Sequence, residues 1–517
     1  MKLVLQTVRT FFTYAAIGIV NTAVSLLLYF LLIALHITPT IALAVSYFAG
    51  MGTSYFLNAR FTFNQNAYSA ALVLRFLTVN VVLLLMSEWS LHEIMHVLTR
   101  SAYLAQIVNV IPMTLIGYLA NRQFVFTARH DDRENRIYAG FFGCAVGIAL
   151  IQRIWVTLGG YLFSATHHVK TLKWLLIQGL IHWDAGWFLS IARHGYVHVT
   201  QLAFFPFYPV IIRVFHDATT LPDTVSGVIV SSVSFVVAMY YLGRIAHRLF
   251  STRVAILAML FFAFFPTSYY FDAPYSEALF MALSLAAVEN AYRRNFFLAS
   301  FLTALATLTR NTGALLLLLV FWQYLSWRGM DFRFYTRAWW KKLDYRVMSL
   351  TLPIVFLLSY AVWLHQHYGH YLAFLTAEKH WHRQYMPLWD TYAHTLRQYI
   401  TGLHPILASY YLLLELISAL LSIVFIALSI WSYRVHRAQG DWILYLVILT
   451  WIASTEPSVN IPDYLVSLPR YLLMLFPGFI LLAERFPRIA VAIPLLLVSA
   501  IFLLRLSGLY YSGSWIA

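Results

Sequence analysis

The chain carries very little charge for its length. Only 11% of its 517 residues are charged, whereas 61% are hydrophobic and 17% are aromatic. A soluble globular protein needs more polar surface than this, so the composition excludes that class and requires many transmembrane helices. The apolar segments are about 17–25 residues long and lack the alternating pattern of a membrane β-barrel. We therefore expect an all-α polytopic membrane protein.

Cysteine is almost absent as well. Cys144 is the single cysteine and lies in an apolar segment, which excludes a disulfide framework and a zinc–cysteine site. The histidines of 364–370 and 380–382 could bind a metal, but no carboxylate stands at a suitable spacing. We predict no metal cofactor and leave dependence on a divalent cation open. The net charge of +15 is the Lys and Arg excess expected of cytoplasmic loops, so no nucleic-acid partner is predicted.

Residues 1–130 are expected to form a first membrane domain with four spans. The expected spans are 11–35, 39–57, 72–91 and 103–120. The start of the chain has a basic flank but no small-residue cleavage pattern, so the first span is expected to be retained.

Two segments of this domain look duplicated. SYFLNARFTF at 54–63 and GYLANRQFVF at 117–126 share tyrosine, asparagine and phenylalanine at a constant offset. Tandem two-helix units are common in proteins that move substrates across bilayers. The alternative is that two helix ends use similar aromatic and basic anchors. The side chains predicted to contact lipid head groups on the inner leaflet are Asn58, Arg60, Asn121 and Arg122.

The most hydrophilic stretch, TARHDDRENRIY at 127–138, separates this domain from a second one at 138–517. Eleven spans are expected in the second domain, which makes about fifteen in total. They are placed at 138–163, 224–249, 254–272, 276–292, 296–309, 311–327, 347–365, 408–432, 441–456, 470–483 and 489–508.

The basic residues predict the orientation of these spans. A cytoplasmic N-terminus puts most Lys and Arg residues in inner segments, as the positive-inside rule requires. With this orientation, polar side chains collect at the outer ends of the second domain's spans. They lie in HWDAGWFLSIARHGY at 182–196, PYSE at 274–277, TRN at 309–311, HWHR at 380–383 and LPRY at 468–471. We therefore expect a multi-pass protein of the inner membrane with its chemistry on the outer face.

One carboxylate, Asp184, stands between Trp183 and Trp187 at the end of an apolar stretch. A sugar carried on a polyprenyl phosphate already has a good leaving group, so its transfer needs one base for the acceptor hydroxyl and cations for the phosphate. Glycoside hydrolysis, by contrast, needs two carboxylates. Asp184 is therefore the candidate general base. The plainer alternatives are a helix N-cap and a simple ion pair with Arg193.

The candidates for holding the donor phosphate are mostly arginines, whose planar fork suits bidentate binding. Glu277 could equally be a first-turn acid that complements a helix dipole, and Arg310 could be an interfacial anchor. The predicted donor-binding set is Arg193, His194, Glu277, Arg310, Arg383 and Arg470, with Arg193 and His194 expected nearest the base.

The first domain resembles the GtrA family, small four-span proteins implicated in moving polyprenyl-phosphate sugars across the membrane. AAIGIVNT (15–22), LRFLTVN (74–80) and the two repeated helix ends carry this resemblance. It implies no catalytic residue. It implies instead that the domain flips or presents a lipid-linked sugar; a domain that only docks or stabilises the second one is the plainer alternative.

The second domain resembles the PIG-V-type mannosyltransferases of the GT-C superfamily. Five motifs in order carry this resemblance: HWDAGWFLSIARHGY, FFPFYP, FPTSYYFDAPYSEALF, LATLTRNTG and SLPRYLLMLFPGFILLA. The family implies an inverting transfer of mannose from a lipid-phosphate donor on the non-cytoplasmic side, with an outer-loop aspartate as base. Asp184 falls on that position. The family often shows an aromatic residue or Phe where this chain has His182 and Trp183, a departure that alters the edge of the donor pocket.

The expected function is thus a membrane hexosyltransferase, with mannose as the expected sugar and a polyprenyl-phosphate sugar as donor. The acceptor is a glycan, a lipid or a protein, and the sequence does not choose among them. A flippase without transferase chemistry is the main alternative, and a structural scaffold is a third. Four spans are few for a flippase, so a homo-oligomer formed through the first domain is a further hypothesis.

Overall fold

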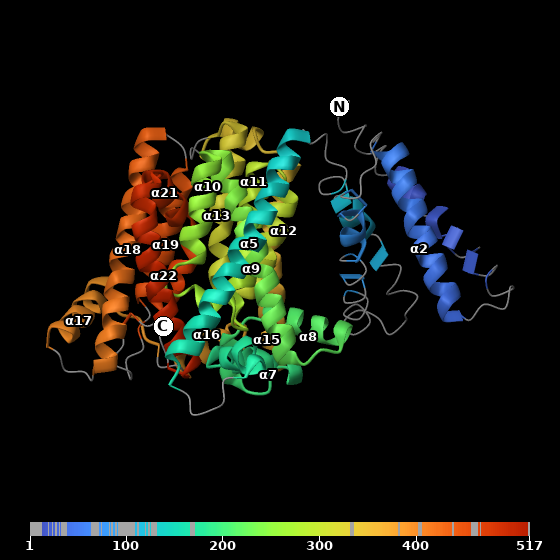
Figure 1. Ribbon diagram of the computed structural model, residues 1–517. Helices are drawn as coiled ribbons and strands as arrows, with labels where there is room; N and C mark the ends of the chain where they lie inside the picture. The colour runs from blue at the N-terminus through green and yellow to red at the C-terminus, as the bar shows by residue number, and fades with distance from the viewer. Residues whose placement is uncertain are drawn as a thin grey trace. The chain divides into compact units, whose positions relative to one another are not determined.

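The computed structural model describes 39–63, scattered positions either side of them between 13 and 125, and most of 132–514. The undescribed parts of that last range are 166–170, 331–334, 381–382, 402–405, 437–438, 456, 458–463 and 466. The chain divides into two compact units, Met1–His130 and Asp131–Ala517 (Figure 1). Within these described ranges every regular element is helical, which confirms the predicted all-α class.

The described part of the first unit centres on one long helix. Helix α2 spans Pro39–Leu57 and continues directly into a π-helix at Asn58–Thr62. Asn121 and Val125, in the second copy of the repeated motif, also have π-helical backbone. The two copies therefore share a local backbone form that is rare in proteins. The other three spans predicted here are only partly described, so the four-helix bundle stays a prediction.

Among the residues described in the second unit, five stretches are long and apolar enough to cross a membrane. They are Gly140–Phe163, Asp223–Leu249, Tyr345–Tyr368, Leu412–His436 and Ile489–Tyr511. Three shorter apolar helices accompany them: α10 (Thr252–Ala263), α12 (Phe296–Thr309) and α19 (Gly440–Thr455). The structure thus supports a multi-pass membrane protein, and the count of about fifteen spans stays a prediction.

The bounds of the long helices follow the predicted spans with one clear difference. They are α5 (Asp132–Phe163), α9 (Asp223–Leu249), α15 (Leu352–Tyr368), α18 (Ile406–His436) and α22 (Ile489–Tyr511). The predicted boundary segment at 127–138 is partly helical, because α5 begins at Asp132. Polar residues therefore extend a spanning helix beyond its apolar part.

Helix α11 (Ser276–Tyr292) lies at the centre of the unit, packed between α9 and α12. It is apolar on nearly all sides, as a helix buried in a bundle must be. A buried glutamate stands near each end. Glu277 lies in the first turn, and Glu289 near the last turn accepts hydrogen bonds from Arg244 at 2.8 Å and Arg248 at 2.9 Å. Both charges are therefore paired, as burial requires.

Three predicted spans are interrupted in the structure. The span expected at 254–272 ends as helix α10 at Ala263, and a 3₁₀ helix follows at Ser268–Phe271. Pro266 cannot donate a backbone hydrogen bond, which favours a helix end just before it. The span at 311–327 opens with a 3₁₀ helix, Asn311–Leu315, before α13 (Leu316–Arg328). The span at 470–483 breaks into α20 (Leu468–Tyr471), a 3₁₀ turn at Leu472–Met474 and α21 (Phe476–Arg485).

The remaining elements are short and lie between the long helices. They are α6 (Leu172–Leu176), α7 (Asp184–His194), α8 (Phe207–Thr219), α14 (Arg337–Lys341), α16 (Ala373–His380), α17 (Leu388–Thr401), and the 3₁₀ helices Gln178–Leu180, Val199–Ala203 and Tyr345–Thr351. Helices α7, α8 and α16 gather at one end of the second unit, the lower end in Figure 1. The breaks in α10 and α20 bring irregular backbone into this unit, where side chains can project from helix ends.

Candidate active site

Asp184 is the first residue of α7. The helix buries Ala185, Phe188 and Leu189 against the rest of the unit, which fixes its position. The preceding residue, Trp183, has φ +53° and ψ −118°, a conformation that costs a non-glycine residue about 1–3 kcal/mol. Backbone strain of this kind gathers at functional sites. The turn aims the Asp184 carboxylate out of the helix end, and its side chain keeps 17% of its surface exposed.

Arg470 of α20 binds Asp184 across 286 residues of sequence. Its Nη1 donates to the Asp184 carboxylate at 2.5 Å. Helix α20 is entered through Ser467, whose φ of +72° is again unusual for a non-glycine residue. A residue with positive φ therefore precedes each helix of this ion pair: Trp183 comes before α7, which begins with Asp184, and Ser467 comes before α20, which contains Arg470. A buried guanidinium at this distance holds a carboxylate firmly.

Glu277 joins Arg470 to a second arginine. Its carboxylate lies 3.3 Å from Nε of Arg470 and accepts a hydrogen bond from Nη1 of Arg310 at 2.7 Å. Arg310 also donates to the hydroxyl of Ser276 at 3.0 Å. Glu277 is fully buried, and its second carboxylate oxygen has no hydrogen-bond partner among the described residues. Its role in this structure is to orient two cations.

Two tyrosine rings complete the surroundings of Arg470. Its guanidinium lies 5.8 Å from the ring centroids of Tyr270 and Tyr275, both of them buried. Contacts between a cation and an aromatic face stabilise a partly desolvated charge. Sequence reasoning did not assign these tyrosines, although the run of aromatic residues in FPTSYYFDAPYSE was the available signal.

His182 lies just before the strained turn. Burial lowers the pKa of its imidazole below the usual 6.5, and a hydrogen bond with the backbone of Tyr511 opposes this only partly. Its Nε2 is buried and has no hydrogen-bond partner among the described residues. Burial therefore favours the neutral form of His182, two residues before the candidate base, because the charged form is poorly solvated there.

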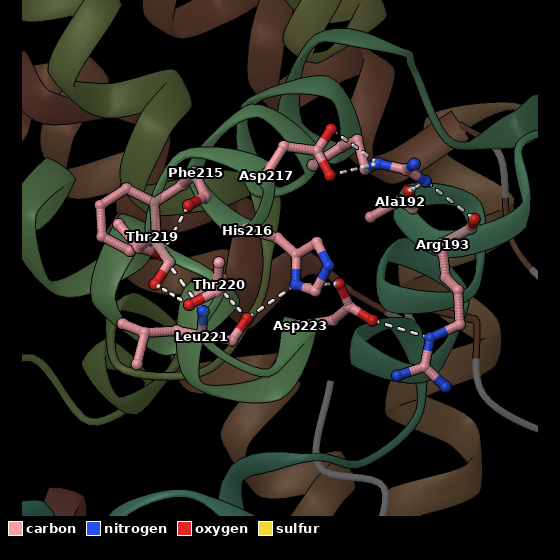
Figure 2. A network of polar contacts seen from close by, with 11 residues as sticks. Ala192, Arg193, Phe215, His216, Asp217, Thr219, Thr220, Leu221 and Asp223 are labelled. Atoms are coloured by element: carbon pink, nitrogen blue, oxygen red, sulfur yellow. Dashed lines mark hydrogen bonds and ion pairs between the residues drawn. The ribbon is translucent and has the colours of Figure 1, made fainter.

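Arg193 and His194 do not join Asp184. They stand at the other end of α7, about 14–15 Å along the helix at 1.5 Å per residue. Nε of Arg193 donates to Asp223 at 2.8 Å. Asp223 is buried and also faces Nδ1 of His216 at 3.2 Å, as Figure 2 shows. These contacts tie α7 and α8 to the start of α9, away from the candidate base.

Arg383 lies at the edge of the candidate site. Its Nη2 donates to the hydroxyl of Ser467 at 3.4 Å, and its Nε lies 3.6 Å from the Glu378 carboxylate. It therefore contacts the turn that carries Arg470. The neighbouring 381–382 segment lies outside the described residues. Among the residues that the structure does describe, no group of three potential ligands is arranged to hold a metal ion.

The residues proposed for head-group contact in the first unit are mostly enclosed. Asn58 and Asn121 are buried. Asn58 donates to Ser54 at 3.2 Å and accepts from Thr62, whereas Asn121 donates to Tyr14 and to the Gly117 carbonyl. These bonds favour a structural role for both amides. Arg60 is exposed and remains available to a head group, and Arg122 lies outside the described residues.

Comparison with known families matches both units. The description "GtrA/DPMS, transmembrane domain" matches residues 13–126, and "Mannosyltransferase (PIG-V)" matches residues 160–503. The second match covers well over half of the chain and includes Asp184, Glu277, Arg310 and Arg470. The chain belongs to the PIG-V mannosyltransferase family. The first unit carries a GtrA/DPMS transmembrane domain ahead of the PIG-V region.

Curated relatives are similar over part of this PIG-V chain. GPI alpha-1,6-mannosyltransferase 2 of Mus musculus is 32% identical over 192 residues, which are 35% of this chain and 38% of the relative. The protein of that name from Homo sapiens is 33% identical over 27% of this chain and 30% of the relative. GPI mannosyltransferase 2 of Drosophila pseudoobscura pseudoobscura is 31% identical over 27% and 34%. The chain thus spans 30–38% of the length of these relatives, and no solved structure matches it.

Proposed function

We propose that this protein transfers a hexose, with mannose as the expected sugar, from a polyprenyl-phosphate donor to an acceptor hydroxyl. The linked set of Asp184, Arg470, Glu277 and Arg310 carries this proposal. It joins one partly exposed carboxylate to the buried guanidinium of Arg470 and, through Glu277, to the half-buried guanidinium of Arg310. The PIG-V family and its relatives, which are named as mannosyltransferases, support the sugar.

The charges of the set suit a phosphate donor. Arg310 and Arg470 carry two positive charges, and Glu277 neutralises one of them. The remaining positive charge is at present held by Asp184. A phosphodiester brings one negative charge, so it can take the place of Asp184 on Arg470 without leaving a buried cation unpaired. Donor binding would then release the carboxylate to act as a base.

The reaction follows from these placements. The acceptor oxygen attacks the anomeric carbon of the sugar from the side opposite the phosphate, and its proton passes to the Asp184 carboxylate. The bond between the anomeric carbon and the phosphate oxygen breaks, and the polyprenyl phosphate leaves with both bonding electrons. One displacement inverts the anomeric centre. Arg470 and Arg310 stabilise the charge that develops on the leaving phosphate.

The orientation of the site is part of the proposal. The positive-inside rule assigns the start of α7, α11 and α20 to the non-cytoplasmic side of the membrane, so the donor's sugar must be reached from there. Dependence on a divalent cation stays open. The acceptor stays open among a lipid, a glycan and a protein.

The test is reconstitution of the full-length protein in liposomes that contain a synthetic polyprenyl-phosphate mannose and a mixture of lipid and glycan acceptors. We expect transfer of mannose from this donor and none from a nucleotide-activated mannose. A protein that moves the donor between leaflets without transferring the sugar would overturn the proposal in favour of a flippase.

A further inference from the structure

The segment that leads into Asp184 has too little regular structure to pair all of its own backbone groups. Residues 171–183 form two very short helices, α6 and the 3₁₀ helix Gln178–Leu180, followed by the strained turn at Trp183. Helices this short leave most of their terminal carbonyls without partners inside the segment. Carbonyl groups without a partner inside the segment take hydrogen bonds from other parts of the fold; the backbone N–H of Ala185 in α7 already donates to the His182 carbonyl at 3.1 Å.

Two tyrosines of α22 and the tyrosine that precedes α11 supply three of these donors. Tyr511 donates its hydroxyl hydrogen to the Leu175 carbonyl at 2.7 Å, and Tyr510 donates to the Leu180 carbonyl at 3.0 Å. Tyr275, just before α11, donates to the His182 carbonyl at 3.0 Å. Arg153 of α5 donates to the Leu176 carbonyl as well. Four carbonyls within eight residues are therefore held by side chains from outside the segment.

The rings of these tyrosines are held in place by close packing. Tyr275, Tyr510 and Tyr511 are fully buried. The ring of Tyr511 lies in a slot between two glycines: a Cβ on Gly160 would stand 2.6 Å from it, and one on Gly179 2.5 Å. The ring of Tyr510 packs edge-on against His182 at 5.6 Å. Rings held this tightly make rigid donors.

The last of these hydrogen bonds, from Tyr275 to the His182 carbonyl, lies two residues before Asp184. The His182 carbonyl precedes Trp183, whose strained backbone places Asp184 at the helix start. A strained turn persists only when its surroundings hold it in place. The ring of Tyr275, which holds the His182 carbonyl, also lies against Arg470. The support therefore reaches both members of the Asp184–Arg470 pair.

We infer that Tyr510 and Tyr511 at the end of the last helix, α22, are positioning residues for Asp184. They hold the carbonyls of 175–182 so that the turn at Trp183 keeps the carboxylate in its productive place. The inference rests on the proposed function in naming Asp184 as the base. It adds that Tyr510 and Tyr511, the last two residues of α22, affect the rate of sugar transfer through the position of Asp184, without contacting the substrate.

The test uses the full-length protein and removes single hydroxyl groups. Tyr510→Phe and Tyr511→Phe keep the buried rings and lose one hydrogen bond each. Tyr445→Phe is the matched control, because the buried Tyr445 also donates to a backbone carbonyl, that of Met474 at 3.1 Å, away from the 171–183 segment. All three variants lose the same kind of bond, so a general loss of stability is common to them.

Two readouts are measured on each variant. Hydrogen exchange of the amides of 175–184 should become faster in Tyr510→Phe and Tyr511→Phe and stay as in the wild type in Tyr445→Phe. The turnover number for mannose transfer should fall about 10- to 100-fold in the two test variants, because small displacements of a reacting group have effects of that size. The KM for the donor should change less than about twofold, since the arginines keep their places.

Either readout can overturn the inference. Exchange at 175–184 in Tyr510→Phe that matches Tyr445→Phe would show that the hydroxyl groups do not hold the segment. Faster exchange with an unchanged turnover number would show that the segment does not position the base. Wild-type protein that transfers no sugar would defeat the proposed function, and the exchange readout would then still decide whether the tyrosines hold this segment.

Discussion

At the scale of single residues, the Asp184–Arg470 pair is the feature on which the chemistry depends. Nη1 of Arg470 lies 2.5 Å from the carboxylate, so in this structure the candidate base is occupied by a cation. Arg470 also faces Glu277 and two tyrosine rings. Removing its charge would leave Asp184 without its cation and Glu277 with Arg310 alone, and breaking a buried ion pair costs about 3–5 kcal/mol.

A milder substitution tests the role of the guanidinium fork. Arg470→Lys keeps the charge but cannot bond Asp184, Glu277 and a phosphate at once. We expect kcat/KM for the lipid donor to fall about 10- to 100-fold, the equivalent of one charge-assisted hydrogen bond. Arg213→Lys is the control, because Arg213 pairs with Asp217 on the surface of α8. Equal kinetics for the two variants would contradict the role of Arg470.

His182 gives a prediction about pH. Burial lowers the pKa of the folded-state imidazole, whereas in the unfolded chain it keeps a pKa near 6.5. Below about pH 6.5 the unfolded state therefore binds a proton that the folded state does not, and stability falls until the pH passes below the folded-state pKa. His182→Asn should remove this part of the acid destabilisation. Thermal denaturation from pH 8 to pH 5 checks it: parallel curves for wild type and variant would rule it out.

The residues of the site were only partly predictable. Asp184, Glu277, Arg310 and Arg470 could be chosen from the sequence because charged groups at the ends of apolar spans are rare. Arg193 was expected near Asp184 because it is close in sequence, but the helical rise carries it to the far end of α7, where Asp223 binds it. Tyr510 and Tyr511 could not be chosen, since nothing local distinguishes a tyrosine that donates to a distant carbonyl.

At the scale of elements, the packing of α22 against α5 determines where the supporting tyrosines stand. The two helices approach closely at small residues, as membrane helices commonly do. A Cβ on Gly508 of α22 would stand 2.4 Å from Cβ of Phe163 and 2.9 Å from the Gly159 carbonyl. Glycine at 508 is therefore a requirement of the contact. Gly147 of α5 has open space around it instead.

The two glycines form a matched pair for a stability test. Gly508→Ala should lower the free energy of unfolding by about 1–3 kcal/mol, because the added methyl group must displace backbone. Gly147→Ala should leave it unchanged or raise it by up to about 1 kcal/mol, because alanine favours a helix. Chemical denaturation in detergent measures both. A loss in Gly147→Ala as large as that in Gly508→Ala would contradict the tight contact.

Sequence patterns predicted the long helices better than the broken ones. Spans such as Asp223–Leu249 and Ile489–Tyr511 are uniform apolar runs, and their positions followed from hydrophobicity alone. The breaks in α10 and α20 fall within runs that are equally apolar. They depend on Pro266, on the turn at Ser467 and on partners elsewhere in the fold, such as the hydrogen bond from Thr267 to the Pro469 carbonyl. The hydrophobicity of a segment gives no information on hydrogen-bond partners that lie far away in the sequence.

At the scale of the whole molecule, two membrane units share one chain. The first unit matches a GtrA/DPMS transmembrane domain and the second the PIG-V family. We propose a supply arrangement, in which the first unit delivers a lipid-linked sugar that the second consumes. Linking the two raises the effective concentration of donor near the transferase when the geometry allows it.

This arrangement predicts a dependence on the leaflet that holds the donor. Protein lacking 1–130 should transfer mannose normally when the donor is in the leaflet facing Asp184. It should transfer slowly when the donor is confined to the opposite leaflet, where the full chain stays active. Proteoliposomes loaded with donor on one side measure both rates. Equal rates for the two proteins on both sides would reduce the first unit to a docking or stabilising role.

The most direct test of the account is the rate of mannose transfer by Asp184→Asn at saturating donor, with bound donor measured in the same proteoliposomes. The substitution keeps the size of the side chain and removes the base. We predict that the variant binds donor and loses transfer by at least about 100-fold, a typical contribution of a general base. Asp217→Asn, on the exposed face of α8, should match the wild type. An Asp184→Asn protein that transfers mannose at the wild-type rate would contradict Asp184 as the base.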